Sequence, residues 1–192
     1  MRITGIVLCG GRSSRMQSDK AFLSYHSKPQ AFHVAGLMSA YCDEVLFSIN
    51  KSQVANFTNS ANYIIDRPEF ENHGPLTGIL SIAEKTSSDA YLVSGCDYPF
   101  LGEEELRRLK EAWLNCHKPC SLMNLKSGRI EPLLSIYTSI DILNLKAHLT
   151  MGKDSLFHYL SEINPVRVTP ANDNSCISVD TLEQYLELKK TF

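Results

Sequence analysis

The sequence lacks any hydrophobic run long enough to cross a membrane, and its first residues lack the basic and apolar regions of a secretory leader. It also lacks an excess of charge of either sign, because 19 Lys and Arg residues stand against 21 Asp and Glu residues and leave a formal net charge of −2. A broad basic surface of the kind that binds nucleic acid or anionic lipid is therefore not expected. We predict a cytoplasmic protein that binds neither nucleic acid nor membrane.

Motifs for metal coordination and for nucleophilic catalysis are scarce. Cys116 and Cys120 lie close together in the sequence, but no second pair follows at the spacing of a zinc site. The six cysteines are scattered, which favours reduced thiols, and Cys96 is expected to be a small buried side chain because nothing marks a base for it. The six histidines show no paired spacing, so none is a strong candidate for a general base. These absences argue against a structural zinc site and against thiol or histidine chemistry.

What the sequence does contain is an alternation of apolar strands and amphipathic helices. This pattern is typical of an α/β fold with a mostly parallel sheet that is covered by helices on both faces. A chain of 192 residues, 43% of them hydrophobic, suffices for one domain, and we predict a single domain over 1–192 with a three-layer, Rossmann-like architecture. Strands are expected at 3–8, 45–49, 63–65, 90–94, 121–125, 133–137 and 166–168. Helices are expected at 29–41, 75–83, 103–113, 139–149 and 155–161, with a last helix that is capped by Asp180 and runs to Lys190.

Glycines and cations gather directly after the first expected strand. Glycine lets backbone N–H groups turn toward an anion and approach it closely. The order of residues fits neither the dinucleotide fingerprint G-x-G-x-x-G nor the Walker A pattern. We therefore predict a phosphate-binding loop of another kind, in which Arg15 and Lys20 hold charged phosphate groups. The glycines and cations of this segment are Gly10, Gly11, Arg12, Arg15 and Lys20.

Three aspartates are candidates for binding a nucleotide or a metal. Asp97 follows the strand at 90–94 and Asp66 ends the strand at 63–65, so both are expected at the ligand-binding edge of a parallel sheet. Asp97 suits Mg²⁺, which commonly uses one or two carboxylates together with water and phosphate oxygens. Asp66 can accept the N1–H and N2–H₂ donors of guanine. Asp180 either completes the metal site or caps the last helix together with Glu183.

The loop order L-x-G-G-x-S-x-R-M-x-x-D-K resembles that of the nucleotidyltransferases, and within them most resembles the molybdenum cofactor guanylyltransferases. Further blocks extend the resemblance along nearly the whole chain: GPLTGI from Gly74, CDYPFL from Cys96, EPL from Glu131 and VDT from Val179. The resemblance implies transfer of GMP from Mg-GTP to the terminal phosphate of Mo-molybdopterin, with release of pyrophosphate. It also implies Mg²⁺ as the cofactor. Contact with a chaperone that inserts the finished cofactor into a molybdoenzyme is left open.

The resemblance also implies a division of labour along the chain. Residues up to about 105 would bind the nucleotide, and residues from about 106 to 192 would bind the acceptor, with the segment 129–134 and Gly152-Lys153 toward it. The expected catalytic residues are Arg15, Lys20 and Asp97, and the expected metal ligands are Asp97 and Asp180. The expected nucleotide-binding residues are Leu8, Cys9, Gly10, Gly11, Lys20, Asp66, Gly78 and Asp97.

Three positions depart from the family pattern: Cys9 replaces an alanine, Gln17 replaces a glycine, and Ser48 replaces an asparagine that helps to bind the nucleotide. Two alternatives stay open, and the changes at Gln17 and Ser48 are the only hints for the second. One is a different transferase, for example a cytidylyltransferase of the same cofactor or one that acts on a sugar or alcohol phosphate. The other is a nucleotide-binding regulator without turnover. The paired Gly10-Gly11, with C-D-x-P from Cys96 downstream, resembles the guanine branch of the family more than the cytidine branch, and so favours guanine.

Overall fold

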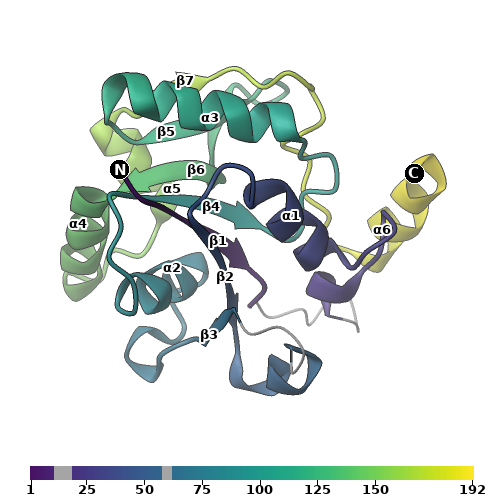
Figure 1. The fold of residues 1–192 in the computed structure, drawn as a ribbon, viewed down its shortest axis with the longest axis horizontal. Helices are drawn as coiled ribbons and strands as arrows, with labels where there is room; N and C mark the ends of the chain where they lie inside the picture. Colours follow the sequence, from purple (N-terminus) through teal and green to yellow (C-terminus); the bar gives the residue numbers. More distant parts are fainter. Residues whose placement is uncertain (11–18, 58–61) are drawn as a thin grey trace.

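Strands from both halves of the chain form one continuous sheet. The computed structural model describes residues 1–10, 19–57 and 62–192, and within them seven strands pair in the order β3-β2-β1-β4-β6-β5-β7 (Figure 1). Neighbouring strands are parallel except where β6 pairs with β4 and β5. The predicted α/β fold with a mostly parallel sheet is confirmed. The strands are β1 (Ile3–Leu8), β2 (Glu44–Ile49), β3 (Tyr63–Ile65), β4 (Ala90–Gly95), β5 (Cys120–Asn124), β6 (Arg129–Thr138) and β7 (Val166–Val168).

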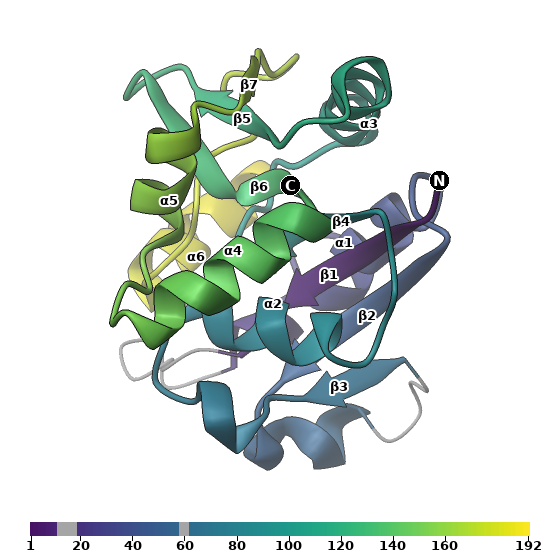
Figure 2. The ribbon, with the colours of Figure 1, turned by 90° about the vertical axis from the view of Figure 1, so that its left-hand side faces the viewer.

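Helices cover both faces of this sheet and produce the three layers (Figure 1, Figure 2). On one face lie α1 (Gln30–Met38) and α3 (Glu103–Cys116), and on the other lie α2 (Pro75–Ala83), α4 (Ser139–Thr150) and α5 (Leu156–Ile163). The central strand β1 contributes Val7 to the first core and Ile6 and Leu8 to the second, as expected when successive side chains of a strand alternate between faces. Because β1 is buried on both faces, its sequence is a continuous apolar run.

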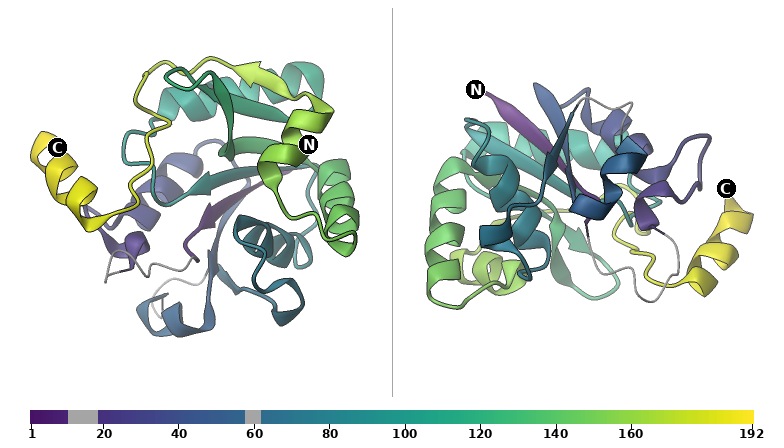
Figure 3. Two further views of the ribbon diagram at one scale, coloured as in Figure 1. Left: turned by 180° about the vertical axis from the view of Figure 1, so that it is seen from behind. Right: turned by 90° about the horizontal axis from the view of Figure 1, so that it is seen from below.

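The last helix, α6 (Leu182–Leu188), lies at the periphery, away from the sheet (Figure 3). It is held to the body by Tyr185, whose ring lies 5.0 Å from that of Tyr25 and whose hydroxyl donates to the Ser24 carbonyl. The predicted cap of this helix is wrong by one residue. Thr181 caps the helix by accepting from the Gln184 backbone N–H, and the Gln184 side chain accepts from the Thr181 N–H in return.

Several boundaries also differ from those expected. The helix α1 ends at Met38, three residues before the predicted end, and β6 begins at Arg129, four residues before the predicted start. A 3-10 helix, η2 (Lys51–Phe57), occupies a stretch for which the sequence predicted no element. None of the helices in the described ranges is long and apolar enough to cross a bilayer.

Gly78 permits an unusually close contact between α2 and the ends of β1 and β2. A Cβ atom built on Gly78 would lie 2.1 Å from Ser48 Oγ and 2.6 Å from Leu8 Cδ2. We expect Gly78→Ala to lower the free energy of unfolding by about 1–3 kcal/mol, because the helix or the strand ends must shift to admit the methyl group. Chemical denaturation measures this change.

Gly36 provides the matched control, since it is also a helical glycine, and apart from its chain neighbours and the backbone of its own helix no atom of the described residues lies within 4 Å of where its added methyl group would be. Gly36→Ala should leave stability unchanged or raise it by up to about 1 kcal/mol, because alanine favours the helix. Equal stability of the Gly78→Ala and Gly36→Ala proteins would contradict the packing role of Gly78.

Candidate functional site

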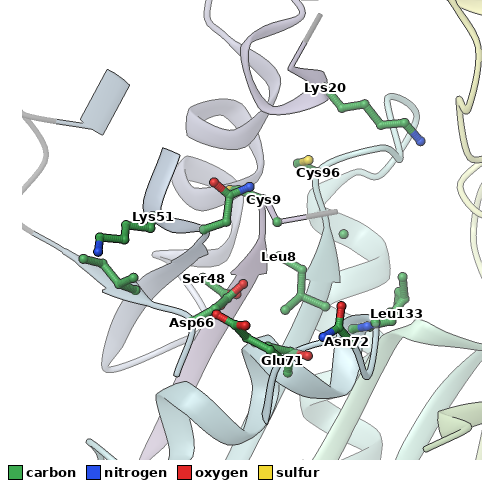
Figure 4. A pocket seen from close by; sticks show the side chains of 18 of the residues that line it. Leu8, Cys9, Lys20, Ser48, Lys51, Asp66, Glu71, Asn72, Cys96 and Leu133 are labelled. Atoms are coloured by element: carbon green, nitrogen blue, oxygen red, sulfur yellow. The ribbon is translucent and has the colours of Figure 1, made fainter. Parts of the chain in front are cut away.

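A cleft of about 880 Å³ opens at the carboxyl ends of β1, β2, β3 and β4 (Figure 4). The chain proceeds from β1 outward to β2 and β3, and then returns to the other side of β1 with β4. The strand order therefore reverses beside β1, and open α/β sheets bind their ligands at such a reversal. The residues that line the cleft are Leu8, Cys9, Gly10, Lys20, Ser48, Asn50, Lys51, Ile65, Asp66, Pro68, Glu71, Asn72, Gly74, Pro75, Thr77, Gly78, Gly95, Cys96, Asp97 and Leu133.

One side of the cleft carries a lysine between two carboxylates. Lys20 Nζ donates to Asp180 Oδ1 at 2.6 Å and lies 3.7 Å from Asp97 Oδ2. The side chains of Lys20 and Asp97 are each only 20% exposed, whereas that of Asp180 is 57% exposed. Asp180 therefore faces solvent at the rim, while Lys20 and Asp97 lie deeper. This placement shows that the Asp180 carboxylate pairs with Lys20 and does not cap α6.

Asp97 has an incomplete set of hydrogen bonds. Its Oδ1 atom is buried and accepts no hydrogen bond from the residues that the structure describes. A Cβ on Gly95 would lie 2.4 Å from this atom, so the glycine makes room for the carboxylate. Burial raises the pKa of Asp97 above its ordinary value, and the Lys20 charge partly offsets the rise. A buried carboxylate oxygen without a donor fits a cation ligand.

The candidate metal ligands in this region are few. Asp97 and Asp180 share Lys20, but no group of three or more His, Cys, Asp or Glu residues in the described ranges could hold an ion. Mg²⁺ tolerates this, since it often takes one or two carboxylates and fills its other positions with water and phosphate oxygens. The two residues fit a magnesium ion that arrives with a triphosphate better than one bound by protein alone.

The opposite side of the cleft is built around Asp66, which Figure 4 shows well apart from Lys20. Ser48 Oγ donates to Asp66 Oδ1 at 2.6 Å. The other oxygen, Oδ2, lies 2.9 Å from the position of a Cβ on Gly10, so only glycine fits there without a shift. Burial raises the pKa of Asp66, and the hydrogen bond from Ser48 offsets part of the rise, while the Glu71 charge adds to it.

The floor of the cleft contains two thiols, Cys9 and Cys96, each 5% exposed. Burial raises the pKa of the Cys9 thiol well above its ordinary value, and the neighbouring Cys96 adds to this effect. Cys96 is a small buried side chain, as expected. Both thiols are buried, so neither has the exposure that a reactive cysteine needs.

A bulge in β6 begins directly after Glu131 and contains Pro132 and Leu133 of the EPL motif. Ser121 pairs with Ser135 and the next residue, Leu122, pairs with Glu131, so three residues of β6 have no partner on β5. The bulge directs Leu133 into the cleft. Tyr98, one residue after Asp97, fixes the Glu131 carboxylate through a hydrogen bond of 2.8 Å.

The structure brings most of the predicted site residues to this one cleft: Leu8, Cys9, Gly10, Lys20, Asp66, Gly78 and Asp97. Asp180 joins them through Lys20. Gly11 and Arg15 lie outside the described residues. Gly152 and Lys153 line a separate cavity of about 290 Å³ beside α4 and α5, which the sequence did not predict.

Several cleft residues carried no signal in the sequence. Lys51 begins the 3-10 helix η2, and Glu71 directly follows another 3-10 helix, η3 (Pro68–Phe70). In the sequence, both look like polar residues of any surface loop. Leu133 could have been found from the EPL motif, but its direction depends on the bulge. That these three side chains line the cleft was therefore not predictable from local sequence.

The family model and the most similar curated proteins found by comparison all carry names of nucleotidyltransferases. The family described as "MobA-like NTP transferase domain" matches residues 5–163. A protein of Bacillus cereus (strain Q1), named "Probable molybdenum cofactor guanylyltransferase", is 31% identical over 193 residues, which cover 97% of this chain and 95% of the relative. A protein of Bacillus anthracis with the same name is 31% identical over 196 residues, covering 98% and 96%.

Solved structures share the fold. The crystal structure of molybdopterin-guanine dinucleotide biosynthesis protein A from Archaeoglobus fulgidus aligns with a TM-score of 0.74 at 18% identity, covering 98% of this chain and 97% of that one. At this identity the likeness concerns the arrangement of the sheet and helices.

Proposed function

The chain belongs to the MobA-like NTP transferase family, and from this we propose that it transfers GMP from GTP to the terminal phosphate of Mo-molybdopterin and releases pyrophosphate. The family and the names of the relatives make it a nucleotidyltransferase. The particular nucleotide and acceptor are our proposal, as are Mg²⁺ as the cofactor and the cytoplasm as its location. The relatives named guanylyltransferases support this choice over the other transferases.

The observation that carries the proposal is a cleft with two chemically different sides. Lys20, Asp97 and Asp180 form a charged side, and the Ser48–Asp66 pair forms a hydrogen-bonding side. A nucleoside triphosphate has the same division, with a polyanionic chain at one end and a hydrogen-bonding base at the other. Both sides lie at the edge of the sheet where ligands of this fold class bind.

On the charged side, we propose that Lys20 and Arg15 hold the triphosphate and that Asp97 and Asp180 hold Mg²⁺. The attacking phosphate and the leaving pyrophosphate are both anionic, so neutralising charge and aligning the two groups supply most of the catalysis. When bound, Mg²⁺ adds positive charge beside the phosphate oxygens. Lys20 would then exchange the Asp180 carboxylate for phosphate oxygens.

On the other side, we propose that Asp66 accepts hydrogen bonds from guanine. Ser48 occupies Oδ1 and thereby fixes the orientation of the carboxylate. Oδ2 lies beside Gly10, two residues after the end of β1, where the absence of a side chain leaves room for this oxygen. Leu8, Cys9, Gly11 and Gly78 would complete the surroundings of the nucleotide.

The acceptor would lie toward β6. Among the described residues, those that line the cleft belong to the first 105 except Leu133, and Asp180 reaches the rim through its pair with Lys20. This distribution supports nucleotide binding by the first part of the chain. The two parts share one sheet, and they share the first core, since the cluster that contains Ile3 also contains Val168 and Cys176. We therefore propose one domain over 1–192, in which 106–192 contributes the acceptor side.

GTP should bind at least about tenfold more tightly than ATP. Guanine offers an N1–H donor where adenine has an acceptor, and a buried polar contact left unmatched costs about 1–3 kcal/mol. Isothermal titration with GTP, ATP and CTP in the presence of Mg²⁺ measures the difference. Asp66→Asn should reduce the preference, because the amide presents a donor as well as an acceptor.

Equal affinity for the three nucleotides would remove guanine from this account, and tighter binding of CTP would favour a cytidylyltransferase. Pyrophosphate release in the presence of Mo-molybdopterin tests turnover separately. Selective GTP binding without release of pyrophosphate would favour the nucleotide-binding regulator.

A further inference from the structure

The buried side-chain amide of Gln53 links the segments that follow β1 and β2 to Asp19, the residue before Lys20. Gln53 lies in η2 and is 5% exposed. Its Nε2 donates to the Cys9 carbonyl at 3.0 Å and to Asp19 Oδ2 at 2.7 Å, while its Oε1 accepts from the Asn50 backbone N–H at 2.9 Å. Both donors and the acceptor of the amide are thus used, and they contact three separate segments: the end of β1, the residue after β2, and Asp19.

Asp19 connects Gln53 to Lys20, because it caps the short helix that begins with Lys20. Its Oδ1 accepts from the Ala21 backbone N–H and caps the 3-10 helix η1 (Lys20–Phe22), while its Oδ2 is held by Gln53. The cap sets the backbone from which the Lys20 side chain enters the cleft. Gln53 therefore relates the position of Lys20 to that of β1, from a distance of 33 residues in sequence.

We propose that Gln53 is a positioning residue for phosphate binding: through Asp19 it holds Lys20 at a fixed place relative to the floor of the cleft. This proposal rests on the proposed function, since it requires Lys20 to bind the triphosphate. Gln53 itself lies behind Cys9 and Asp19 and does not line the cleft. It is consequently expected to affect the phosphates of a bound nucleotide more than the base.

A purely structural role for Gln53 within η2 is the competing explanation. The start of η2 has its own cap, because Asn50 Oδ1 accepts from the Ser52 N–H, the Ser52 hydroxyl and the Gln53 N–H. Ser52→Ala removes one bond of this cap and leaves the three bonds of the Gln53 side chain in place. It is therefore a matched control within the same helix.

The test begins with Gln53→Glu, which keeps the size and the acceptor for Asn50 but replaces the donor with an oxygen. Two carboxylates then face each other at positions 19 and 53. We expect GTP to bind about tenfold more weakly, while guanosine binds within about twofold of the parent protein. Asp19→Asn reaches the same hydrogen bond from its other end and should show the same pattern, which keeps the test valid if Gln53→Glu fails to fold.

The double variant Asp19→Asn with Gln53→Glu separates positioning from general damage. The amide introduced at position 19 can donate to the carboxylate introduced at position 53 and can still accept from Ala21, so the bond is restored with its polarity reversed. The bond from position 53 to the Cys9 carbonyl stays lost, so we expect recovery to be partial: the double variant should bind GTP more tightly than Gln53→Glu alone, as shown by titration of the parent, both single variants and the double variant. A double-variant loss equal to the product of the single losses would overturn the proposal.

Two further outcomes are decisive. If Lys20→Ala weakens GTP binding but Gln53→Glu binds GTP as well as Ser52→Ala does, the positioning role is wrong and the proposed function stands. If Lys20→Ala leaves GTP binding unchanged, phosphate binding by Lys20 is wrong, and the role of Gln53 is wrong with it.

Discussion

Asp97→Asn should abolish, or nearly abolish, turnover while leaving the fold intact. The amide keeps the size of the side chain but removes the negative charge that we propose for holding Mg²⁺. The structure adds a second expectation. Burial raises the pKa of Asp97, and its Oδ1 accepts no hydrogen bond from the described residues. The charged form of the side chain is therefore poorly stabilised, so removing the charge should not lower the melting temperature. Pyrophosphate release across a Mg²⁺ titration, together with thermal melting, measures both effects.

Asp173→Asn serves as the control, because Asp173 is exposed and does not line the cleft. It should retain full activity and an unchanged Mg²⁺ requirement. If Asp97 only shapes its turn, asparagine is nearly as good a turn and capping residue, and Asp97→Asn should behave like the control. An active Asp97→Asn enzyme with the parent's Mg²⁺ dependence would move the metal site to Asp180 or remove it.

Lys20→Ala should weaken GTP binding by roughly tenfold to a hundredfold, because a charge-assisted hydrogen bond contributes about 1.5–3 kcal/mol. Guanosine, which lacks phosphates, should bind with nearly unchanged affinity. The comparison of the two ligands by calorimetry therefore reports on phosphate binding rather than on the integrity of the cleft. The amine already lies between Asp97 and Asp180, so its position is well defined before any ligand binds.

Lys85→Ala is the matched control for this substitution, since Lys85 is an exposed lysine just after α2 and does not line the cleft. It should bind both ligands like the parent. Equal losses for GTP and guanosine in Lys20→Ala would point to a damaged cleft, and no loss for either would place Lys20 outside the phosphate site.

The strands and the edge at which they end were predictable from the sequence. Apolar runs such as Ile3–Leu8 are long enough to mark buried strands, and glycines or aspartates directly after them mark the strand ends. The residue that caps the last helix was not predictable from the sequence. Two capping boxes, one residue apart, fit equally well: Asp180 with Glu183, and Thr181 with Gln184. Lys20 decides between them by engaging the Asp180 carboxylate, a contact across 160 residues.

The same limit applies to Gln53 and Leu133. The hydrogen-bond partners of Gln53 include Cys9 and Asp19, which lie 44 and 34 residues away, so no local pattern distinguishes this glutamine from a surface one. Leu133 enters the cleft because of a register shift between β5 and β6, which depends on strand pairing. Local sequence identifies where strands end, but it does not specify which distant side chains meet there.

The lysine between two carboxylates also sets the charge on its own side of the cleft before a ligand enters. Lys20, Asp97 and Asp180 together carry one positive and two negative charges when ionised, a sum of −1. These three groups would oppose a free triphosphate and attract a divalent cation. Under the proposed function, the metal is then needed for the nucleotide to enter as well as for the chemistry, so nucleotide and metal are expected to bind as one complex.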